Sequence, residues 1–316
     1  MSNAPPPDLP PAPAGPLALT VRCHQEPCQA AARGNKETTH MAASMPLVLD
    51  HGEPMSPAPT QPLITLRGVA KTYRTASGGE VRALAGVDLA IGEGEFVCVV
   101  GPSGCGKSTL LRLLAGLDDC EEGALSLDGT TVTGPSSDVG VVFQAANLLP
   151  WLTVRENIRL PLRVGGRHRP AEVRIDDLLG IAGLRDFGER YPYELSGGMQ
   201  QRAGICRALV RDPRILLMDE RFGALDALTR ERMNSELQRI WQVSGKTVLL
   251  ITHSISEAIF LGDRVVVMSA RPGRILRELA VPIPRPRSFD TIVSSPAYPA
   301  LAREIRTLLN AEGDVT

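Results

Sequence analysis

A glycine-rich run, GPSGCGKST at residues 101–109, contains the residue types that point most directly to chemistry. Its spacing, G-x-x-x-x-G-K-[ST] from Gly101 to Ser108, predicts a loop whose backbone amides surround phosphate groups. Lys107 is placed to reach the β- and γ-phosphates, and Ser108 is placed to bind Mg²⁺. Lysine occurs at only four positions in a chain that otherwise uses arginine, so the lysine at position 107 is informative. Its compact ammonium can enter a phosphate-binding loop where a planar guanidinium would not fit in the same way.

A pair of carboxylates follows a second apolar segment. Four apolar residues, Ile215 to Met218, lead directly into Asp219 and Glu220. A buried strand of this kind delivers its last side chains to the carboxyl edge of a sheet, where α/β folds bind ligands. Asp219 is then predicted to hold Mg²⁺, directly or through water, and Glu220 to orient and deprotonate an attacking water. The alternative, two acidic residues that only cap a strand, loses weight because a phosphate loop lies upstream.

A second anion-binding element is indicated by LSGGMQQR at residues 195–202. Ser196, followed by Gly197, Gly198 and a helical run, predicts a helix N-terminus with accessible amides. One ATP does not need two such cradles from a single chain. The pattern therefore predicts two chains arranged head to tail, each covering the γ-phosphate held by the other.

The expected elements bring these motifs to one edge of a sheet. Apolar runs at 95–101, 214–220 and 246–253 predict buried strands, the last two of them parallel. Helices are expected to follow from Lys107 and to span about 226–243. A closing hairpin with its turn at Arg271–Gly273 is also expected, so the fold class is α/β with a phosphate loop between a strand and a helix.

The chain divides into three predicted parts. Residues 1–62 hold half of the 26 prolines and no apolar periodicity, which predicts a disordered tail. Residues 63–285 contain every motif. Their first two apolar segments, LITLRGVAKTY and VRALAGVDLAI, alternate like strands of an antiparallel edge sheet. Residues 145–205 are expected to be mostly helical. Residues 286–316 are expected to form a C-terminal extension in which PRPR breaks regular structure and a short helix follows.

Composition narrows the function classes. The 316 residues carry a net charge of −1, so no general attraction to nucleic acid is expected. No apolar run reaches the roughly 18 residues of a membrane-spanning helix, and the N-terminus does not follow the pattern of a secretory signal. The six cysteines show no zinc-like pairing and are expected to be free thiols in a reducing compartment.

Across about residues 63–285, these motifs resemble the nucleotide-binding subunits of ABC transporters. The resemblance implies a P-loop ABC ATPase with a RecA-like core, an antiparallel β edge subdomain and a helical signature subdomain. It assigns GPSGCGKST as Walker A, ILLMDE as Walker B and LSGGMQQR as the signature. It also implies that Gln144 binds Mg²⁺ and senses the γ-phosphate, that Asp226 ends the D-loop, that His253 is the switch histidine and that Tyr73 stacks on adenine.

The implied site comprises three sets of residues. The catalytic set is Glu220, His253 and Gln144, and the Mg²⁺ set is Ser108, Gln144 and Asp219. The ATP-binding set is Tyr73, Gly101, Pro102, Ser103, Gly104, Cys105, Gly106, Lys107, Ser108, Thr109, Ser196, Gly197, Gly198, Gln200 and Asp226. The assignment of Tyr73 to adenine stacking has weaker support, because a tyrosine on the surface of an edge strand would give the same sequence pattern.

Longer segments, including VVFQAANLLPWLTVRENI and EAIFLGDRVVVMSARPGRI, resemble the nitrate/sulfonate/taurine group of bacterial importers. The resemblance implies an ATPase subunit that energises uptake of a small anion such as nitrate, a sulfonate or taurine; the alternative is an importer of a different small solute. The implied partners are a second copy of the chain, two transmembrane permease subunits and an extracytoplasmic solute-binding protein, with no nucleic acid. The implied location is peripheral, on the cytoplasmic face of the inner membrane.

Two residues depart from the family pattern. Arg221 stands where proline usually follows the catalytic glutamate, and Ser254 stands where aspartate usually follows the switch histidine. Proline would fix φ in the turn that carries Glu220, so arginine leaves that turn less constrained. Arg221 is the one feature that favours a nucleotide-binding regulator without hydrolysis. A third class, a soluble ABC ATPase acting on DNA or ribosomes, is disfavoured by the single cassette and the lack of heptad repeats.

Overall fold

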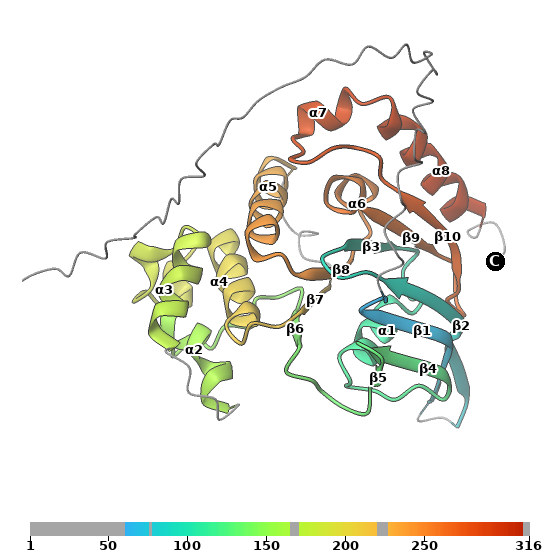
Figure 1. The fold of residues 1–316 in the computed structure, drawn as a ribbon, viewed down its shortest axis with the longest axis horizontal. Helices are drawn as coiled ribbons and strands as arrows, with labels where there is room; N and C mark the ends of the chain where they lie inside the picture. The colour runs from blue at the N-terminus through green and yellow to red at the C-terminus, as the bar shows by residue number, and fades with distance from the viewer. Residues whose placement is uncertain (1–60, 76–77, 165–170, 220–226, 312–316) are drawn as a thin grey trace, which may run out of the picture. The chain divides into compact units, whose positions relative to one another are not determined.

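The computed structural model describes residues 61–75, 78–164, 171–219 and 227–311, which belong to one compact unit spanning 57–316 (Figure 1). The tail predicted for residues 1–62 lies almost wholly outside the described residues. The expectations for Glu220, Arg221 and Asp226 also fall outside them and stay predictions.

A six-stranded sheet forms the centre of this unit, in the order β10-β9-β3-β8-β7-β6. All neighbouring strands are parallel except the β10–β9 pair, which is the predicted closing hairpin. The strands are β3 (Phe96–Val100), β6 (Val139–Val142), β7 (Ile215–Asp219), β8 (Thr247–Ile251), β9 (Arg264–Met268) and β10 (Ile275–Ala280). Both faces of β3 and β8 are buried, which explains why their sequences are continuous apolar runs rather than alternating ones.

A second, four-stranded sheet is antiparallel and has the order β2-β1-β4-β5. Its strands are β1 (Ile64–Arg74), β2 (Glu80–Ile91), β4 (Glu122–Leu127) and β5 (Thr130–Thr131). Helix α1 (Lys107–Leu114) buries Leu110 and Leu113 in one apolar cluster with side chains from both sheets. The predicted antiparallel edge subdomain is therefore confirmed, and α1 is covered by it.

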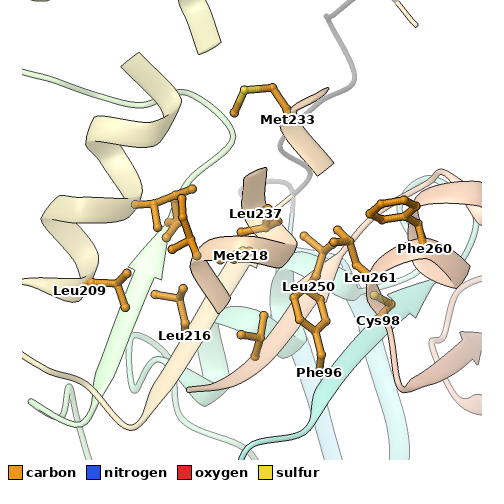
Figure 2. Close-up of a cluster of buried hydrophobic side chains, with 14 of the residues drawn as sticks. Phe96, Cys98, Leu209, Leu216, Met218, Met233, Leu237, Leu250, Phe260 and Leu261 are labelled. Carbon is orange, nitrogen blue, oxygen red and sulfur yellow. The ribbon is translucent and has the colours of Figure 1, made fainter. Parts of the chain in front are cut away.

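Helices cover the other face of the central sheet. Helix α5 (Ala227–Ser244) places Leu237 and Ile240 in a second apolar cluster, with Met218 and Leu250 from the strands. Figure 2 shows Leu237 beside Met218 and Leu250, with Phe96 and Cys98 farther along the same layer. Because successive strand residues point to opposite faces, β3 supplies Phe96 and Cys98 to this cluster and Val97 and Val99 to the other.

Residues 145–205 are mostly helical in the structure, as predicted. The segment contains α2 (Val154–Val164), α3 (Ala171–Ile181), α4 (Gly197–Leu209) and two short 3₁₀ turns, Arg185–Phe187 and Pro192–Glu194. In Figure 1 these helices stand beside the β6 end of the central sheet. The helical signature subdomain implied by the sequence is thus present.

The C-terminal extension contains α7 (Phe289–Val293) and α8 (Ala297–Ala311), where the sequence predicted one helix. Helix α6 (Ile255–Leu261) was also not predicted. Ile292 of α7 and Ile305 of α8 belong to the same apolar cluster as the central sheet. We infer that residues 286–311 are part of the domain rather than an appendage to it.

The PRPR segment has no regular structure, as predicted, but it is firmly held. Arg287 is 4% exposed, and its guanidinium donates hydrogen bonds to backbone carbonyls at the end of α6 and after β10. The accepting carbonyls belong to Ile259, Phe260, Gly262, Val281 and Ile283. Burial lowers the pKa of Arg287 to about 10, so this arginine stays charged at neutral pH.

Cysteines in the described part of the chain are free thiols, and Cys98, Cys105 and Cys206 among them are buried. Burial raises the pKa of the Cys206 thiol to about 12, which keeps it protonated and unreactive at neutral pH. None of the described helices combines the length and the apolar character needed to cross a bilayer.

Candidate functional site

The phosphate loop connects the buried strand β3 to helix α1 and opens into a pocket of about 660 Å³, here called the loop pocket. It is lined by Tyr73, Val81, Ala83, Ser103, Gly104, Gly106, Lys107, Ser108, Thr109, Asp219, Ile251, His253 and Arg271. The structure therefore brings together predicted site residues from four places in the sequence: Tyr73, the loop, Asp219 and His253. Gly101, Pro102 and Cys105, also predicted, form the remainder of the loop.

The loop geometry depends on its glycines and on Lys107. Gly106 has a φ of 102°, and a Cβ atom there would lie 2.6 Å from the carbonyl oxygen of Ala83, so no other residue fits. The Lys107 side chain is 9% exposed, and its Nζ donates to the carbonyls of Gly101 (2.7 Å) and Pro102 (2.8 Å). The ammonium thus sits inside the loop, ready to neutralise an anion in the pocket.

Tyr73 enters the loop pocket from β1, and its hydroxyl is held by Asp118, which follows α1 and is itself held by Arg112 of α1. Its hydroxyl donates to Oδ2 of Asp118 at 2.9 Å, and Nε of Arg112 donates to the same oxygen at 2.7 Å. The hydrogen bond from Arg112 lowers the pKa of Asp118, while burial raises the pKa of Tyr73. A carboxylate accepting from a neutral phenol fixes the ring, with Nζ of Lys71 5.5 Å from its centroid.

Two of the three predicted metal ligands, Ser108 and Asp219, line the loop pocket at the edge of the sheet. Asp219 is the last residue of β7 and pairs with Ile251 of β8, whose chain leads on to His253. Ser108 lies in the first turn of α1, and all of these residues except Ile251 were predicted from sequence. A hydroxyl and a carboxylate facing one pocket are the oxygen donors that Mg²⁺ prefers.

Gln144 does not line the loop pocket. It lies two residues after the end of β6 and is exposed to solvent. Its roles in metal binding and in sensing the γ-phosphate stay predictions.

The signature residues form a separate pocket of about 770 Å³, here called the signature pocket. It is lined by Ser196, Gly197, Gly198, Met199, Arg202, Glu231, Arg232, Met233, Ser235, Glu236 and Phe289. Ser196 caps α4, since its hydroxyl accepts from the Met199 amide at 3.4 Å. Gln200 does not line this pocket; its Nε2 donates to the Pro192 and Leu195 carbonyls of its own chain. The two elements that the sequence predicts to bind anions therefore line different pockets within one chain.

Sequence reasoning missed four residues of the loop pocket: Val81, Ala83, Ile251 and Arg271. The turn that carries Arg271 was predicted, but its approach to the phosphate loop is a tertiary contact without a local signal. Val81 and Ala83 belong to the alternating pattern of β2, which indicates a strand but not which ligand its side chains face.

Comparison with known proteins places this fold and site in a family. The family described as ABC transporter matches residues 84–223. A dimeric structure of a bacterial ABC transporter cassette is 38% identical, with a TM-score of 0.60 over 69% of this chain and 98% of that one. A dimeric post-hydrolysis cassette bound to ADP and Pi is 37% identical, with a TM-score of 0.59. The chain belongs to the ABC transporter family and is an ATP-binding, ATP-hydrolysing subunit.

The curated relatives that it resembles are import subunits. The taurine import ATP-binding protein TauB of Rhizobium johnstonii is 48% identical over 244 residues, covering 75% of this chain and 93% of the relative. The nitrate import ATP-binding protein NrtD of a Synechocystis species is 51% identical over 209 residues, covering 65% and 78%. The importer group expected from the sequence is confirmed by these relatives.

Proposed function

We propose that this chain binds Mg-ATP in the loop pocket and, as a homodimer, hydrolyses it to drive import of a small anion. The observation that carries the proposal is the gathering of Lys107, Ser108, Asp219 and His253 around one pocket. The names of the relatives favour taurine, another sulfonate or nitrate as the solute. An importer of a different small solute is the alternative.

The residues of the loop pocket have separate proposed roles in binding the nucleotide, binding Mg²⁺ and catalysing hydrolysis. The loop amides and Lys107 bind the phosphates, and the Tyr73 ring stacks on adenine. Ser108 and Asp219, with Gln144, would hold Mg²⁺, which neutralises charge on the phosphates when bound. Glu220, which follows Asp219, orients and deprotonates the attacking water, and His253 contacts the γ-phosphate.

Dimerisation completes the site. The signature pocket contains the α4 N-terminus, whose amides attract an anion. It lies apart from the loop pocket within one chain, which supports a head-to-tail dimer in which each chain's signature covers the ATP of its partner. Closure and reopening of this dimer would move the attached permease subunits. A solute-binding protein outside the membrane and a position at its cytoplasmic face complete the proposed assembly.

The permease contact is proposed for the segment after Gln144. Trp151 is 68% exposed there, whereas Leu148, Leu149 and Leu152 are half-buried. Buried Asn157 shapes the segment: its Nδ2 donates to the carbonyls of Leu149 and Leu152, and its Oδ1 accepts from the Leu149 amide at 2.7 Å. These hydrogen bonds hold the backbone of the segment that presents the exposed Trp151 side chain.

A groove of about 440 Å³ lies where the helical segment meets β6. Its lining residues lie in or beside β6, α2 and the end of α4: Ser137, Val139, Gly140, Val141, Phe143, Leu160, Pro161, Val164, Arg207, Ala208, Arg211 and Pro213. An apolar floor with two arginines matches a short amphipathic segment of a permease with acidic residues on its polar side.

Cross-linking tests this contact. Cysteine placed at Trp151 should form a disulfide with a cysteine in the permease's cytoplasmic loop, and its yield should change when ATP is added. Cysteine at exposed Val243 on α5 is the control and should give no cross-link. A scan of exposed positions from 143 to 164 without any cross-link would contradict the proposed surface.

The whole proposal is tested by reconstitution. The chain is purified with its permease subunits in vesicles, and ATP hydrolysis and solute uptake are measured with taurine, nitrate and an uncharged solute as probes. We expect Mg-dependent hydrolysis coupled to uptake of one of the anions. ATP binding without hydrolysis in the full complex would instead favour the regulator suggested by Arg221.

A further inference from the structure

The turn between β9 and β10, residues 269–274, is stabilised by hydrogen bonds among its own residues. The Ser269 hydroxyl donates to the Ala270 carbonyl at 2.8 Å and accepts from the Arg274 amide at 3.0 Å. The Ser269 amide donates to the Arg274 carbonyl at 2.9 Å. A turn with these internal hydrogen bonds has one backbone shape, so it presents the side chain at its tip in a defined place.

The same turn is fastened to the phosphate loop and to β2. The Gly273 amide donates to the Ala83 carbonyl at 2.9 Å, and the Ala85 amide donates to the Gly273 carbonyl at 3.0 Å. A Cβ atom on Gly273 would lie 2.1 Å from the carbonyl oxygen of Cys105, so only glycine allows this approach. The tip of the turn is thereby fixed relative to the loop.

Arg271 is the residue at that tip, and its side chain lines the loop pocket. Its Nε donates to the carbonyl of Gly104 at 3.3 Å, and its Nη2 would lie 3.1 Å from a Cβ at Gly104. The guanidinium therefore lies against the middle of the loop. Arg271 and Lys107 are the arginine and the lysine among the described lining residues, which also include Asp219.

We propose that Arg271 is a further nucleotide-binding residue, which contacts the α- and β-phosphates; this inference rests on the proposed nucleotide site. The amides of such loops surround the α- and β-phosphates, whereas the loop lysine reaches the β- and γ-phosphates. A group bound to Gly104 is therefore beside the first two phosphates. A guanidinium can keep its Nε hydrogen bond to the loop while its two terminal nitrogens donate to phosphate oxygens. A lysine has one nitrogen and cannot make both sets of contacts in this geometry.

Affinity measurements on the full chain test the proposal. ATP and ADP dissociation constants are measured by calorimetric titration for the parent and for Arg271→Gln. We expect both nucleotides to bind about ten-fold more weakly, since one charge-assisted hydrogen-bonded contact is lost. Arg271→Lys should lie between the two. Arg274→Gln, an exposed arginine on the same turn that does not line the pocket, is the matched control and should bind like the parent.

Two further measurements keep the outcome clear. The melting temperature without nucleotide should be the same for Arg271→Gln and the parent, and the salt dependence of ATP affinity should decrease because a phosphate-binding cation is gone. Unchanged affinity for both nucleotides, or a loss confined to ATP, would overturn the assignment. Lys107→Ala in the same titration separates this failure from that of the site itself: if that variant binds as tightly as the parent, the loop pocket is not the nucleotide site.

Discussion

Replacing Glu220 with glutamine is expected to lower the rate of ATP hydrolysis by about 100-fold to 10,000-fold while ATP still binds. Glutamine keeps the shape and hydrogen bonding of the side chain but cannot accept the proton of the attacking water. Because hydrolysis reopens the dimer, the variant should also accumulate as an ATP-bound dimer. Steady-state hydrolysis, ATP titration and size-exclusion chromatography with ATP measure the three effects.

The control for this prediction is Glu304→Gln on α8, an exposed residue of the C-terminal helix that does not line the loop pocket. It makes the same chemical change and should leave hydrolysis unaltered. Hydrolysis by Glu220→Gln at close to the parent rate would show that another group is the base.

Replacing Arg287 with methionine is expected to lower the free energy of unfolding by about 3–5 kcal/mol. Methionine fills much of the space but donates no hydrogen bonds, so buried carbonyls at the end of α6 lose a partner. In a domain of this size the loss corresponds to a fall in melting temperature of roughly 10 °C. Calorimetry or circular dichroism during heating measures it.

Arg306→Met provides the comparison, because Arg306 is exposed on α8. Its expected effect stays within about 0.5 kcal/mol. Arg287→Lys should be intermediate, since an ammonium reaches fewer carbonyls than a guanidinium. Equal melting temperatures for Arg287→Met and Arg306→Met would mean that the buried hydrogen bonds do not stabilise the fold.

The elements with the clearest sequence pattern were predicted well. Strands β3, β7 and β8 are short continuous apolar runs, and burial on both faces is the reason for that pattern. Helix α8 is the helix that was predicted to follow PRPR. Helix α6 was missed because seven residues are too few to show helical periodicity next to a strand.

The candidate site could be predicted wherever a motif fixes both residue type and spacing. The loop, Asp219 and His253 belong to this group. Arg271 could not be predicted because its place beside Gly104 depends on a contact between segments 167 residues apart. Arg287 was missed for a related reason: arginine is usually exposed, and only the folded chain places backbone carbonyls around it.

Helix α1 links the two halves of the nucleotide pocket. Lys107 begins this helix, and Asp118, which holds the Tyr73 hydroxyl, follows soon after its end. The spacing between the proposed adenine contact, Tyr73, and the proposed phosphate contact, Lys107, is thus set by a largely buried helix. One residue inserted into α1 would turn its far end by about 100° and carry Asp118 away from Tyr73. Helix α1 therefore fixes the distance between Lys107 and the carboxylate that holds Tyr73.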